Sequence, residues 1–445
     1  MDFNCEIAYP AAAVRGGAEV PHLKSTAECE SVLMPSPATV FIPMSQHIGA
    51  PCEPCVKVED EVFVGTLIGD SEKYISAPIY SSVSGKVTAI EDYTLTNGAV
   101  CKAIVIESDG LDTPCPDLKP VEVNTIDDLV AATRACGLVG LGGAGFPTHV
   151  KLAPKDENTL DTLIINGAEC EPYITSDYRS CMEDFEDIIE GVYLLKKIIG
   201  FKRVLIAVED NKPAAIEKLA QLASDKRDED NSVKVLKLPS RYPQGAEKVL
   251  IYTATKRRLP LGALPSDVGC MVLNITSVAT LYRYIRTGMP LVKKRITVDG
   301  TAIAEPKNLI VPIGTRIADV IDFCGGFKCD PAKVLYGGPM MGVTVESTQQ
   351  PVLKQNNAIL AFADTADLFP QTTACINCGR CHRACPMKLM PCSVEAALKA
   401  DSTEALTKLH VNYCMECGCC SYSCPAKRPL TQVMRLAKQK VRGGK

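Results

Sequence analysis

Short apolar runs and longer amphipathic segments alternate through the middle of the chain. The apolar runs, which are rich in Ile, Leu and Val, predict β-strands at residues 162–166, 203–209 and 233–238. The segments between them, residues 181–200 and 212–223, have helix-forming composition. Because strands that alternate with helices form parallel crossovers, this region is expected to be an α/β layer.

The polar residues that follow these strands are the first candidates for a ligand site. In a parallel α/β sheet, ligands bind beyond the carboxyl ends of the strands. Those ends are residues 166–172, 209–213 and 239–248. Glu169 and Glu171, two residues apart and close to Asn166, suit hydrogen bonds to ribose hydroxyls or to the edge of a flavin ring. The alternative is a polar loop that exposes its charges to water.

Three other regions have their own patterns. Residues 40–108 contain short alternating strands with turn glycines and predict a small β module. Residues 296–328 predict a strand pair followed by a helix, and residues 393–413 have helix-forming composition. The loop YGGPMMG, residues 336–342, is expected to be a tight turn.

The composition is that of a globular protein, with a length that suits about three domains. Of the 445 residues, 46% are hydrophobic and 22% charged, and the formal net charge is -4. These values exclude a mainly disordered or collagen-like chain and give no indication of a nucleic-acid partner. The N-terminus lacks the order of a secretory signal, and no apolar stretch reaches about 18 residues. We expect an intracellular chain without a spanning helix, held at a membrane only through partners.

Cysteine is unusually frequent. The chain has 22 cysteines, and ten of them lie between Cys375 and Cys424. Because no secretory signal is present, a disulfide framework is not expected, and this density indicates metal binding. Cys52 and Cys55 form an isolated CxxC, for which no redox or ligand role is expected.

Eight of these cysteines form two cassettes with the spacing C-x2-C-x2-C-x3-C-P. Three cysteines at this spacing can place three thiolates on one iron cube, and the fourth cysteine, before proline, usually binds the other cube. The first predicted [4Fe–4S] site is Cys375, Cys378, Cys381 and Cys424. The second is Cys414, Cys417, Cys420 and Cys385.

The alternative for the cassettes is a pair of zinc sites. Zinc ribbons take four ligands as two pairs, which does not fit four cysteines in each compact run. Cys392 and Cys419 have no ligand role in the scheme. Two clusters form a conduit for single electrons, and single-electron centres cannot take a hydride from a nicotinamide without an intermediary.

The glycine-rich stretch that begins at Gly137 fits GxGxxG through Gly140, Gly142 and Gly145. A dinucleotide fingerprint requires a strand immediately before it, whereas the preceding residues 124–137 look helical. The stretch is therefore interpreted as a loop whose backbone can approach a flat or phosphorylated ligand closely.

Four motifs together carry a resemblance to a known family. They are GLGGAGFPTHVK, NGAECEP, YPQGAEK and VLNITSVATL, and their order and spacing are similar to those of the flavin- and NADH-binding subunit of respiratory complex I. With the two cassettes and the N-terminal RGGAEVPHLK…IPMSQHIGAP, the chain more closely resembles the C subunits of Rnf complexes, RnfC. Rnf complexes are membrane-bound ferredoxin:NAD+ oxidoreductases, and the resemblance covers almost the whole chain.

The resemblance implies FMN and NAD(H) as cofactors beside the two clusters, and it assigns roles by position. Gly142, Gly143, Gly145 and Lys151 would hold FMN and its phosphate. Asn166 and Asn274 would contact the flavin, and the FMN and nicotinamide pocket would be lined by Phe146, Glu169, Glu171, Tyr242 and Glu247. Leu141 and Ala168 depart from the complex I subunit, which has arginine and aspartate there.

The flanking regions resemble known modules as well. Residues 40–108 are similar to the hammerhead fold of lipoyl and biotinyl carriers, in which Lys73 and Lys86 are the nearest candidates for a modified lysine, although a scaffold role is favoured. Residues 296–328 resemble a soluble-ligand-binding β-grasp (SLBB) domain, interpreted as packing without chemistry. The basic C-terminus is interpreted as a solvated tail; the alternative is docking to an acidic ferredoxin-like partner or to anionic lipid.

The predicted fold is therefore a multidomain α/β protein. Its expected parts are an N-terminal segment and β hammerhead, an FMN/NADH-binding α/β domain, an SLBB-like β-grasp domain, a helical two-[4Fe–4S] domain and a basic tail. Their expected limits are residues 1–120, 121–290, 291–350, 365–430 and 431–445.

The function implied is electron exchange between NAD(H), FMN and the two clusters, at the cytoplasmic face of a membrane complex. Other Rnf subunits, and ferredoxin indirectly, would be the partners, and they would couple the reaction to Na+ or H+ translocation. Glu169 and Glu171 would repel the 2′-phosphate of NADP, so NAD is expected. Two alternatives are a soluble flavin reductase, such as a microcompartment cobalamin reductase, and a relay that uses only the clusters.

Overall fold

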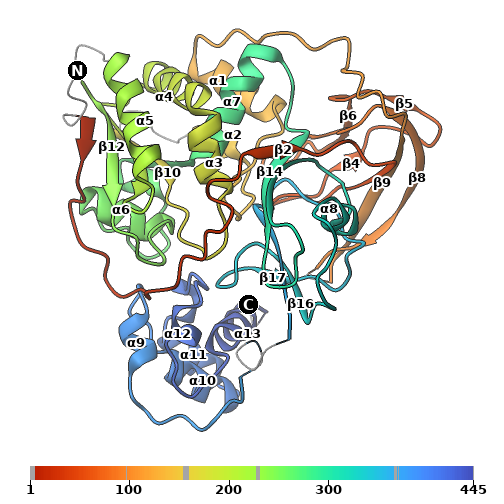
Figure 1. Ribbon diagram of the computed structural model, residues 1–445. Helices are drawn as coiled ribbons and strands as arrows, with labels where there is room; N and C mark the ends of the chain where they lie inside the picture. The colour runs from red at the N-terminus through yellow and green to blue at the C-terminus, as the bar shows by residue number, and fades with distance from the viewer. Residues whose placement is uncertain are drawn as a thin grey trace.

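The computed structural model describes residues 6–96, 98–153, 160–226, 231–364, 368 and 370–443. Within this part, the sheets and helices group into an α/β layer, a β-grasp sheet, a small β module and a helical C-terminal domain (Figure 1). The multidomain fold expected from the sequence is confirmed. No helix in these ranges is long and apolar enough to cross a membrane.

The α/β layer is built on a parallel five-stranded sheet. Its order is β1 (Ile7–Ala8), β12 (Val233–Leu238), β11 (Arg203–Glu209), β10 (Thr162–Gly167) and β13 (Cys270–Asn274). The three strands predicted from the apolar runs are confirmed to within one residue. Strands β1 and β13 lie outside those runs.

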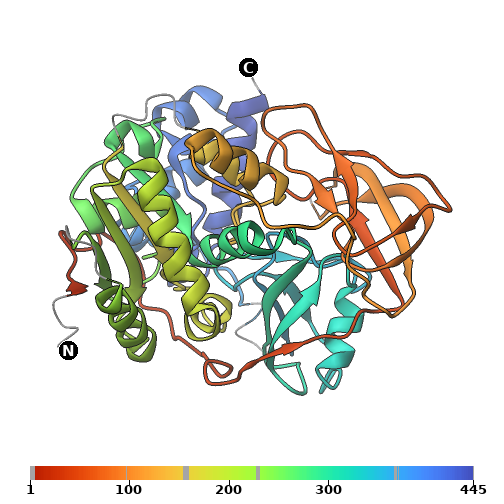
Figure 2. The same cartoon turned by 90° about the horizontal axis from the view of Figure 1, so that it is seen from above.

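Helices cover both faces of this sheet, as Figure 2 shows from above. They are α1 (Ile126–Ala135), α2 (Thr148–Leu152), α3 (Ser176–Glu183), α4 (Phe185–Ile199), α5 (Pro213–Asp225), α6 (Glu247–Thr255) and α7 (Ile275–Thr287). The predicted helix at 181–200 is in fact divided between α3 and α4, which meet at Asp184.

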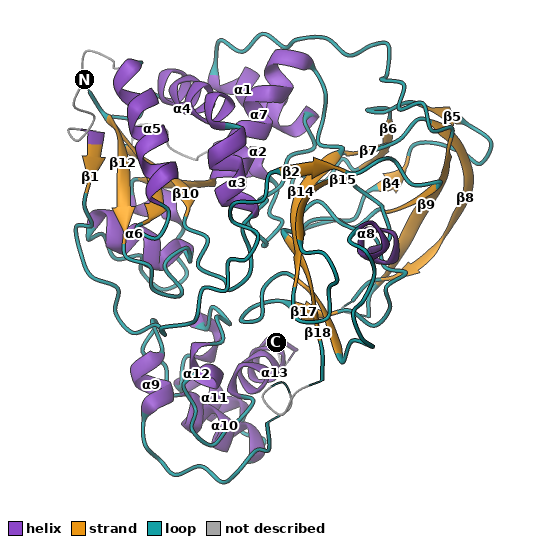
Figure 3. Cartoon of the chain, in the orientation of Figure 1, coloured by secondary structure: helices purple, strands orange, loops and turns teal. Residues whose placement is uncertain are grey.

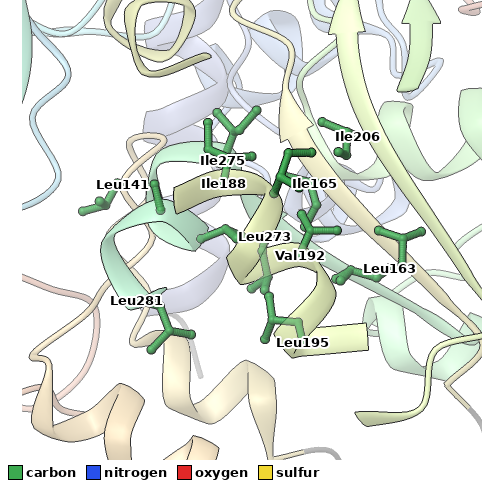
Figure 4. Close-up of a cluster of buried hydrophobic side chains, with 14 of the residues drawn as sticks. Leu141, Leu163, Ile165, Ile188, Val192, Leu195, Ile206, Leu273, Ile275 and Leu281 are labelled. Carbon is green, nitrogen blue, oxygen red and sulfur yellow. The ribbon is translucent and has the colours of Figure 1, made fainter. Parts of the chain in front are cut away.

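Alternation along the strands assigns side chains to the two faces. Leu163 and Ile165 of β10 join the core beneath α4 and α7, whereas Ile164 between them packs toward α6. Figure 4 shows the larger core, in which Ile188 and Val192 of α4 meet the strand residues. Strands β10, β11, β12 and β13 are mostly buried on both faces, which explains their nearly continuous apolar sequences.

The β-grasp sheet has six strands. Its order is β17 (Val343–Thr344), β16 (Lys333–Tyr336), β18 (Ala358–Phe362), β14 (Lys293–Asp299), β15 (Lys307–Pro312) and β2 (Ser31–Leu33), with α8 (Ile317–Phe323) packed on it. Both β18 and β2 lie outside the limits 291–350 expected for this domain.

The β module consists of two antiparallel sheets around a common core. One contains β3 (Thr39–Pro43), β9 (Val100–Ser108), β8 (Gly85–Thr94) and β5 (Glu61–Val62). The other contains β4 (Glu53–Pro54), β6 (Leu67–Asp70) and β7 (Ile79–Tyr80). Lys86 lies inside β8 and forms an ion pair with Glu59, so it is not presented on a turn as a carrier lysine would be.

The C-terminal domain is helical, as Figure 3 shows, and Figure 1 shows it below the other domains. It contains α9 (Arg380–Ala384), α10 (Pro391–Lys399), α11 (Thr403–Lys408), α12 (Cys419–Tyr422) and α13 (Leu430–Gly443). Helix α13 includes most of the segment that we expected to be a solvated tail. Its Leu430, Met434, Ala437 and Val441 are buried at spacings of four and three residues, which is the pattern of a core-facing helix.

The N-terminal segment connects three of these parts rather than belonging to the β module. In Figure 1 it runs from β1, past the C-terminal domain, to β2. We call residues 9–30 the strap. Its Gly17 N–H donates to Ala384 O at 2.8 Å, and its Ala18 N–H donates to Tyr242 O at 2.8 Å. The strap therefore crosses the junction between the α/β layer and the cysteine cassettes.

Candidate functional site

Two asparagines mark the carboxyl ends of the central strands. Asn166 of β10 and Asn274 of β13 are paired in register. The Asn274 Oδ1 accepts from Ser277 N–H at 3.1 Å and so caps α7, while its Nδ2 donates to Asp177 Oδ2 at 2.8 Å. The Asn166 Nδ2 donates to Gly245 O at 2.9 Å. Both amides hold the backbone at this edge of the sheet in place.

The glycine loop, residues 140–146, lies at the N-terminus of α7. Leu141 N–H donates to Ser277 Oγ at 3.2 Å, and the buried Lys294 Nζ donates to Leu141 O at 3.2 Å. Gly143 and Gly145 have φ values of +118° and +63°, which other residues adopt only with strain. The resemblance placed both glycines at the flavin, and the structure brings them to the edge where Asn166 and Asn274 lie.

This loop offers donors for an anion. Within the described ranges, the backbone N–H groups of Gly142, Gly143 and Ala144 have no hydrogen-bond partner, and the three residues are exposed. They lie at the N-terminus of a helix of 13 residues, where the helix dipole favours negative charge. The donor set therefore fits a phosphate such as that of FMN.

Lys151 of α2 is the first lysine or arginine that follows the glycine loop in the sequence. Its Nζ lies 3.1 Å from Glu247 Oε2 and 3.4 Å from Val272 O in the middle of β13. The Lys151 and Glu247 side chains are 33% and 38% exposed, so their ion pair is weak enough to exchange for a ligand. Phe146 is half-buried at the end of the glycine loop.

Glu169 points into the protein rather than into a pocket. Its carboxylate accepts from Asp177 N–H at 2.7 Å, from Tyr178 N–H at 3.3 Å and from Ser176 Oγ at 3.2 Å. These contacts cap α3, and burial raises the pKa of the carboxyl. Glu169 thus differs from the expectation, since its oxygens are already used and do not line an open pocket.

Sequence reasoning gave no role to Lys24, which supports this loop from the strap. Its buried Nζ donates to the carbonyls of Glu169 at 2.8 Å and Glu171 at 2.7 Å, and also to that of Ile174. Burial lowers its pKa, and the Glu169 charge opposes that shift. The neighbouring Lys212 and Glu209 form a buried pair at 2.6 Å. A group of buried charges therefore lies beneath the NGAECEP loop.

Glu171 and Tyr242 lie toward the C-terminal domain. The Glu171 carboxylate accepts from the N–H groups of Met340 at 3.1 Å and Met341 at 2.9 Å, and the Tyr242 hydroxyl lies 3.4 Å from it. Burial raises the pKa of Glu171 to about 7. Tyr242 is 2% exposed and packs in one apolar cluster with Cys417 and Met340. Both residues sit at the junction with the cassettes.

The cysteines of the cassettes surround two hollows. The first is lined by Cys375, Cys378, Cys381, Cys392 and Cys424. The second is lined by Cys385, Cys414, Cys417, Cys419 and Cys420. Each predicted set of four cysteines thus meets at one hollow, with the crossed pairing.

The donor chemistry of the hollows fits a cube better than a single ion. Five cysteines line each hollow, and no three His, Cys, Asp or Glu side chains in the described ranges converge as ligands of one ion would. An all-thiol set of four is the usual ligation of a [4Fe–4S] cluster.

The two hollows differ in their surroundings. Cys375 and Cys378 at the first are exposed. Cys417 and Cys420 at the second are buried, and a Cβ on Gly418 would meet Met340 O at 2.6 Å. The backbone O of Cys385 also lies close to the strap, 2.9 Å from a Cβ built on Gly16. The second hollow is the inner one, next to Tyr242, and the first is the outer one.

Cys392 and Cys419 line the hollows but are not among the eight cysteines with the cassette spacing. We expect Cys392→Ser and Cys419→Ser to retain both clusters, because four other thiols remain at each hollow. Iron and sulfide analysis after anaerobic purification would check this. Loss of half of the iron in either variant would show that the fifth thiol is a ligand.

Comparison with known protein families agrees with the four structural parts. The RnfC barrel sandwich hybrid domain matches residues 12–111, and the Nuo51 FMN-binding domain matches residues 133–283. The SLBB domain matches residues 295–344, and a 4Fe-4S dicluster domain matches residues 368–425.

Curated relatives match over most of the chain. The C subunit of the proton-translocating ferredoxin:NAD(+) oxidoreductase complex of Clostridium ljungdahlii is 44% identical over 85% of this chain and 82% of its own length. The C subunit of the Na(+)-translocating ferredoxin:NAD(+) oxidoreductase complex of Acetobacterium woodii is 42% identical over 96% of both chains.

Among solved structures, an NAD+-reducing [NiFe]-hydrogenase in the H2-reduced state is similar over 73% of this chain and 64% of its own. The sequence identity is 18% and the TM-score 0.48.

Proposed function

The chain belongs to the family of C subunits of ion-translocating ferredoxin:NAD+ oxidoreductase complexes, and we propose that it exchanges electrons between NAD(H) and two [4Fe–4S] clusters through FMN. The observation that carries this proposal is the junction at Tyr242. There the strand-end loops of an FMN-binding domain pack directly against the inner of the two hollows at which the cassette cysteines meet.

The residues proposed to hold FMN are those at the carboxyl edge of β10 and β13. The free N–H groups of the glycine loop and Lys151 would bind the phosphate, and Asn166 and Asn274 would keep the strand ends in position. When bound, FMN supplies the conversion between a two-electron hydride and single electrons. The chain contributes binding, orientation and burial.

Each hollow would hold one cluster with crossed ligands. The inner set is Cys414, Cys417, Cys420 and Cys385, and the outer set is Cys375, Cys378, Cys381 and Cys424. The inner hollow packs on Tyr242 and on the Met340 loop, which Glu171 holds through two backbone N–H groups. This arrangement supports a route from the flavin edge to the inner cluster and then to the outer one.

The family supports a coarse statement of partners and location, and the finer one is proposed. The protein is a subunit of a multi-subunit, membrane-associated ion-translocating complex. We propose that it sits on the cytoplasmic face, that membrane subunits carry Na+ or H+, and that electrons from ferredoxin reach it through other subunits.

NAD, rather than NADP, is the proposed nucleotide. The repulsion expected from Glu169 and Glu171 is weakened in this structure because both carboxylates are hydrogen-bonded, the first buried and the second half-buried. The expectation that NAD is preferred now rests on two other points. A relative is named as a subunit of a ferredoxin:NAD(+) oxidoreductase, and the negative charge of Glu247, which is 38% exposed beside Lys151, would repel a 2′-phosphate. We expect NADPH to support less than about a tenth of the NADH turnover, a difference near 1.4 kcal/mol. Comparable turnover with both nucleotides would contradict this expectation.

The first test is anaerobic purification of the chain with cofactor analysis. The proposal predicts about eight iron atoms, four for each cluster, together with one FMN and NADH-driven reduction of a viologen dye. Both clusters without flavin would identify a cluster-only relay. NADH activity in a protein that never assembles with membrane subunits would favour a soluble reductase.

A further inference from the structure

The outer hollow opens on a surface with an exposed apolar centre. Cys375 and Cys378 are exposed, and Ile376 between them is 68% exposed at the wall of the hollow. In Figure 1 the chain leading into α9 runs along the lower edge of the C-terminal domain, away from the other domains. We call the surface formed by residues 375–380 and 425–428 the outer face.

Four exposed cations lie on or beside this face. Arg380 follows the exposed Cys378 by two residues, and Lys427 follows the Ala426 that lines the hollow. The Arg383 guanidinium lies 3.3 Å from a Cβ built on Gly379, another lining residue. The Lys388 Nζ lies 3.4 Å from Arg383 O. Arg380, Arg383 and Lys427 therefore lie at the rim of the outer hollow. Lys388 lies beside Arg383, between two residues that line the inner hollow.

These cations have no acidic partner in the part of the chain that the structure describes. The ion pairs of the C-terminal domain there include none of Arg380, Arg383, Lys388 and Lys427. The acidic residues elsewhere in the domain already form ion pairs with other cations. These pairs are Glu395 with Arg428, Glu416 with Arg435 and Lys438, Asp401 with Lys440, and Glu404 with Lys408.

The domain as a whole is basic in an acidic chain. Residues 370–443 contain eleven Lys or Arg and four Asp or Glu, whereas the net charge of the chain is -4. The cations left over after pairing include the four at the outer face. A concentrated positive field around an exposed apolar centre attracts an acidic surface and orients it.

From this arrangement we propose that the outer face docks an acidic protein surface that carries a one-electron centre. This inference rests on the proposed function, because it requires a cluster in the outer hollow. One electron would leave the reduced centre of the partner and enter the oxidised outer cluster, so the partner is oxidised and the cluster reduced, with no bond made or broken. Such contacts are usually small and transient, and charge sets their rate more than their strength.

The test measures electron transfer into the purified holoprotein at low ionic strength. An acidic [2Fe–2S] ferredoxin in its reduced form serves as the probe, and freeze-quenched samples follow the loss of its EPR signal. The variant is Arg380→Glu/Lys427→Glu. A matched control, Lys57→Glu/Lys73→Glu, makes the same change in net charge on the exposed surface of the β module.

Three results are expected. The rate with ferredoxin should fall about tenfold or more in the outer-face variant, the control should keep the native rate, and added salt should slow the native protein and reduce the difference. Reduction by the cationic methyl viologen radical should not slow in either variant, because the clusters are unchanged.

Other results would overturn the proposal. An unchanged ferredoxin rate in the outer-face variant means that docking does not occur there, and equal losses with ferredoxin and viologen mean that the substitutions damage the cluster. If flotation shows that phosphatidylglycerol vesicles bind the native chain and not the variant while ferredoxin rates are equal, the face contacts lipid instead. In each case, native iron content and NADH-driven dye reduction would leave the proposed function intact.

Discussion

Replacing Cys385 by serine is expected to remove the inner cluster, although Cys385 belongs to the cassette that forms the outer one. Likewise, Cys424→Ser should remove the outer cluster. In each variant the iron content should fall from about eight to about four atoms per chain. The reason is that Cys385 lines the hollow of Cys414, Cys417 and Cys420.

Double variants separate crossed from uncrossed ligation. With crossed ligands, Cys385→Ser/Cys417→Ser affects one cluster and retains about four irons, whereas Cys385→Ser/Cys378→Ser affects both and retains none. Uncrossed ligation predicts the opposite result for the two variants. Cys392→Ser, which lines the outer hollow without a predicted ligand role, serves as the control for the loss of a thiol.

Lys24→Met is expected to weaken both the fold and the flavin site. The substitution removes a buried amine from three backbone carbonyls and leaves the buried Glu169 carboxylate with less compensation. Removing one member of a buried pair costs about 3–5 kcal/mol. We expect a lower melting temperature, a reduced FMN content and at least about a tenfold loss of NADH-driven dye reduction, since 1.4 kcal/mol already corresponds to tenfold.

Two further variants test the cause. Lys24→Met/Glu169→Gln should recover part of the stability, because the second substitution removes the uncompensated charge. Lys73→Met, at an exposed lysine of the β module, should change the melting temperature little. A native melting temperature and a native FMN content in Lys24→Met would contradict the role given to the strap.

Local patterns made some of these features predictable. The strands β10, β11 and β12 are nearly continuous apolar runs because both faces are buried, so their positions were clear from the sequence. The pairing proposed for the cassettes came from spacing, since three cysteines in one tight turn reach one cluster and a fourth after a longer spacer reaches another.

Other features depend on contacts between distant residues. A loop that leaves a strand can turn its carboxylate outward or inward, and only the packing of α3 decides that Glu169 turns inward. The role of Lys24 depends on the strap crossing three domains. Helix α13 could have been recognised, because Leu430, Met434, Ala437 and Val441 follow a helical period, but its basic residues suggested a solvated tail.

The most direct test of the central claim is anaerobic titration of the reconstituted holoprotein with NADH, followed by flavin absorbance and by EPR of the reduced clusters. NADH is expected to bleach the flavin and to produce cluster signals, with the inner-cluster signal absent in Cys385→Ser and the outer-cluster signal absent in Cys424→Ser. If both clusters and FMN are present but NADH reduces neither, electrons do not enter this chain from NADH, and the proposed function is wrong.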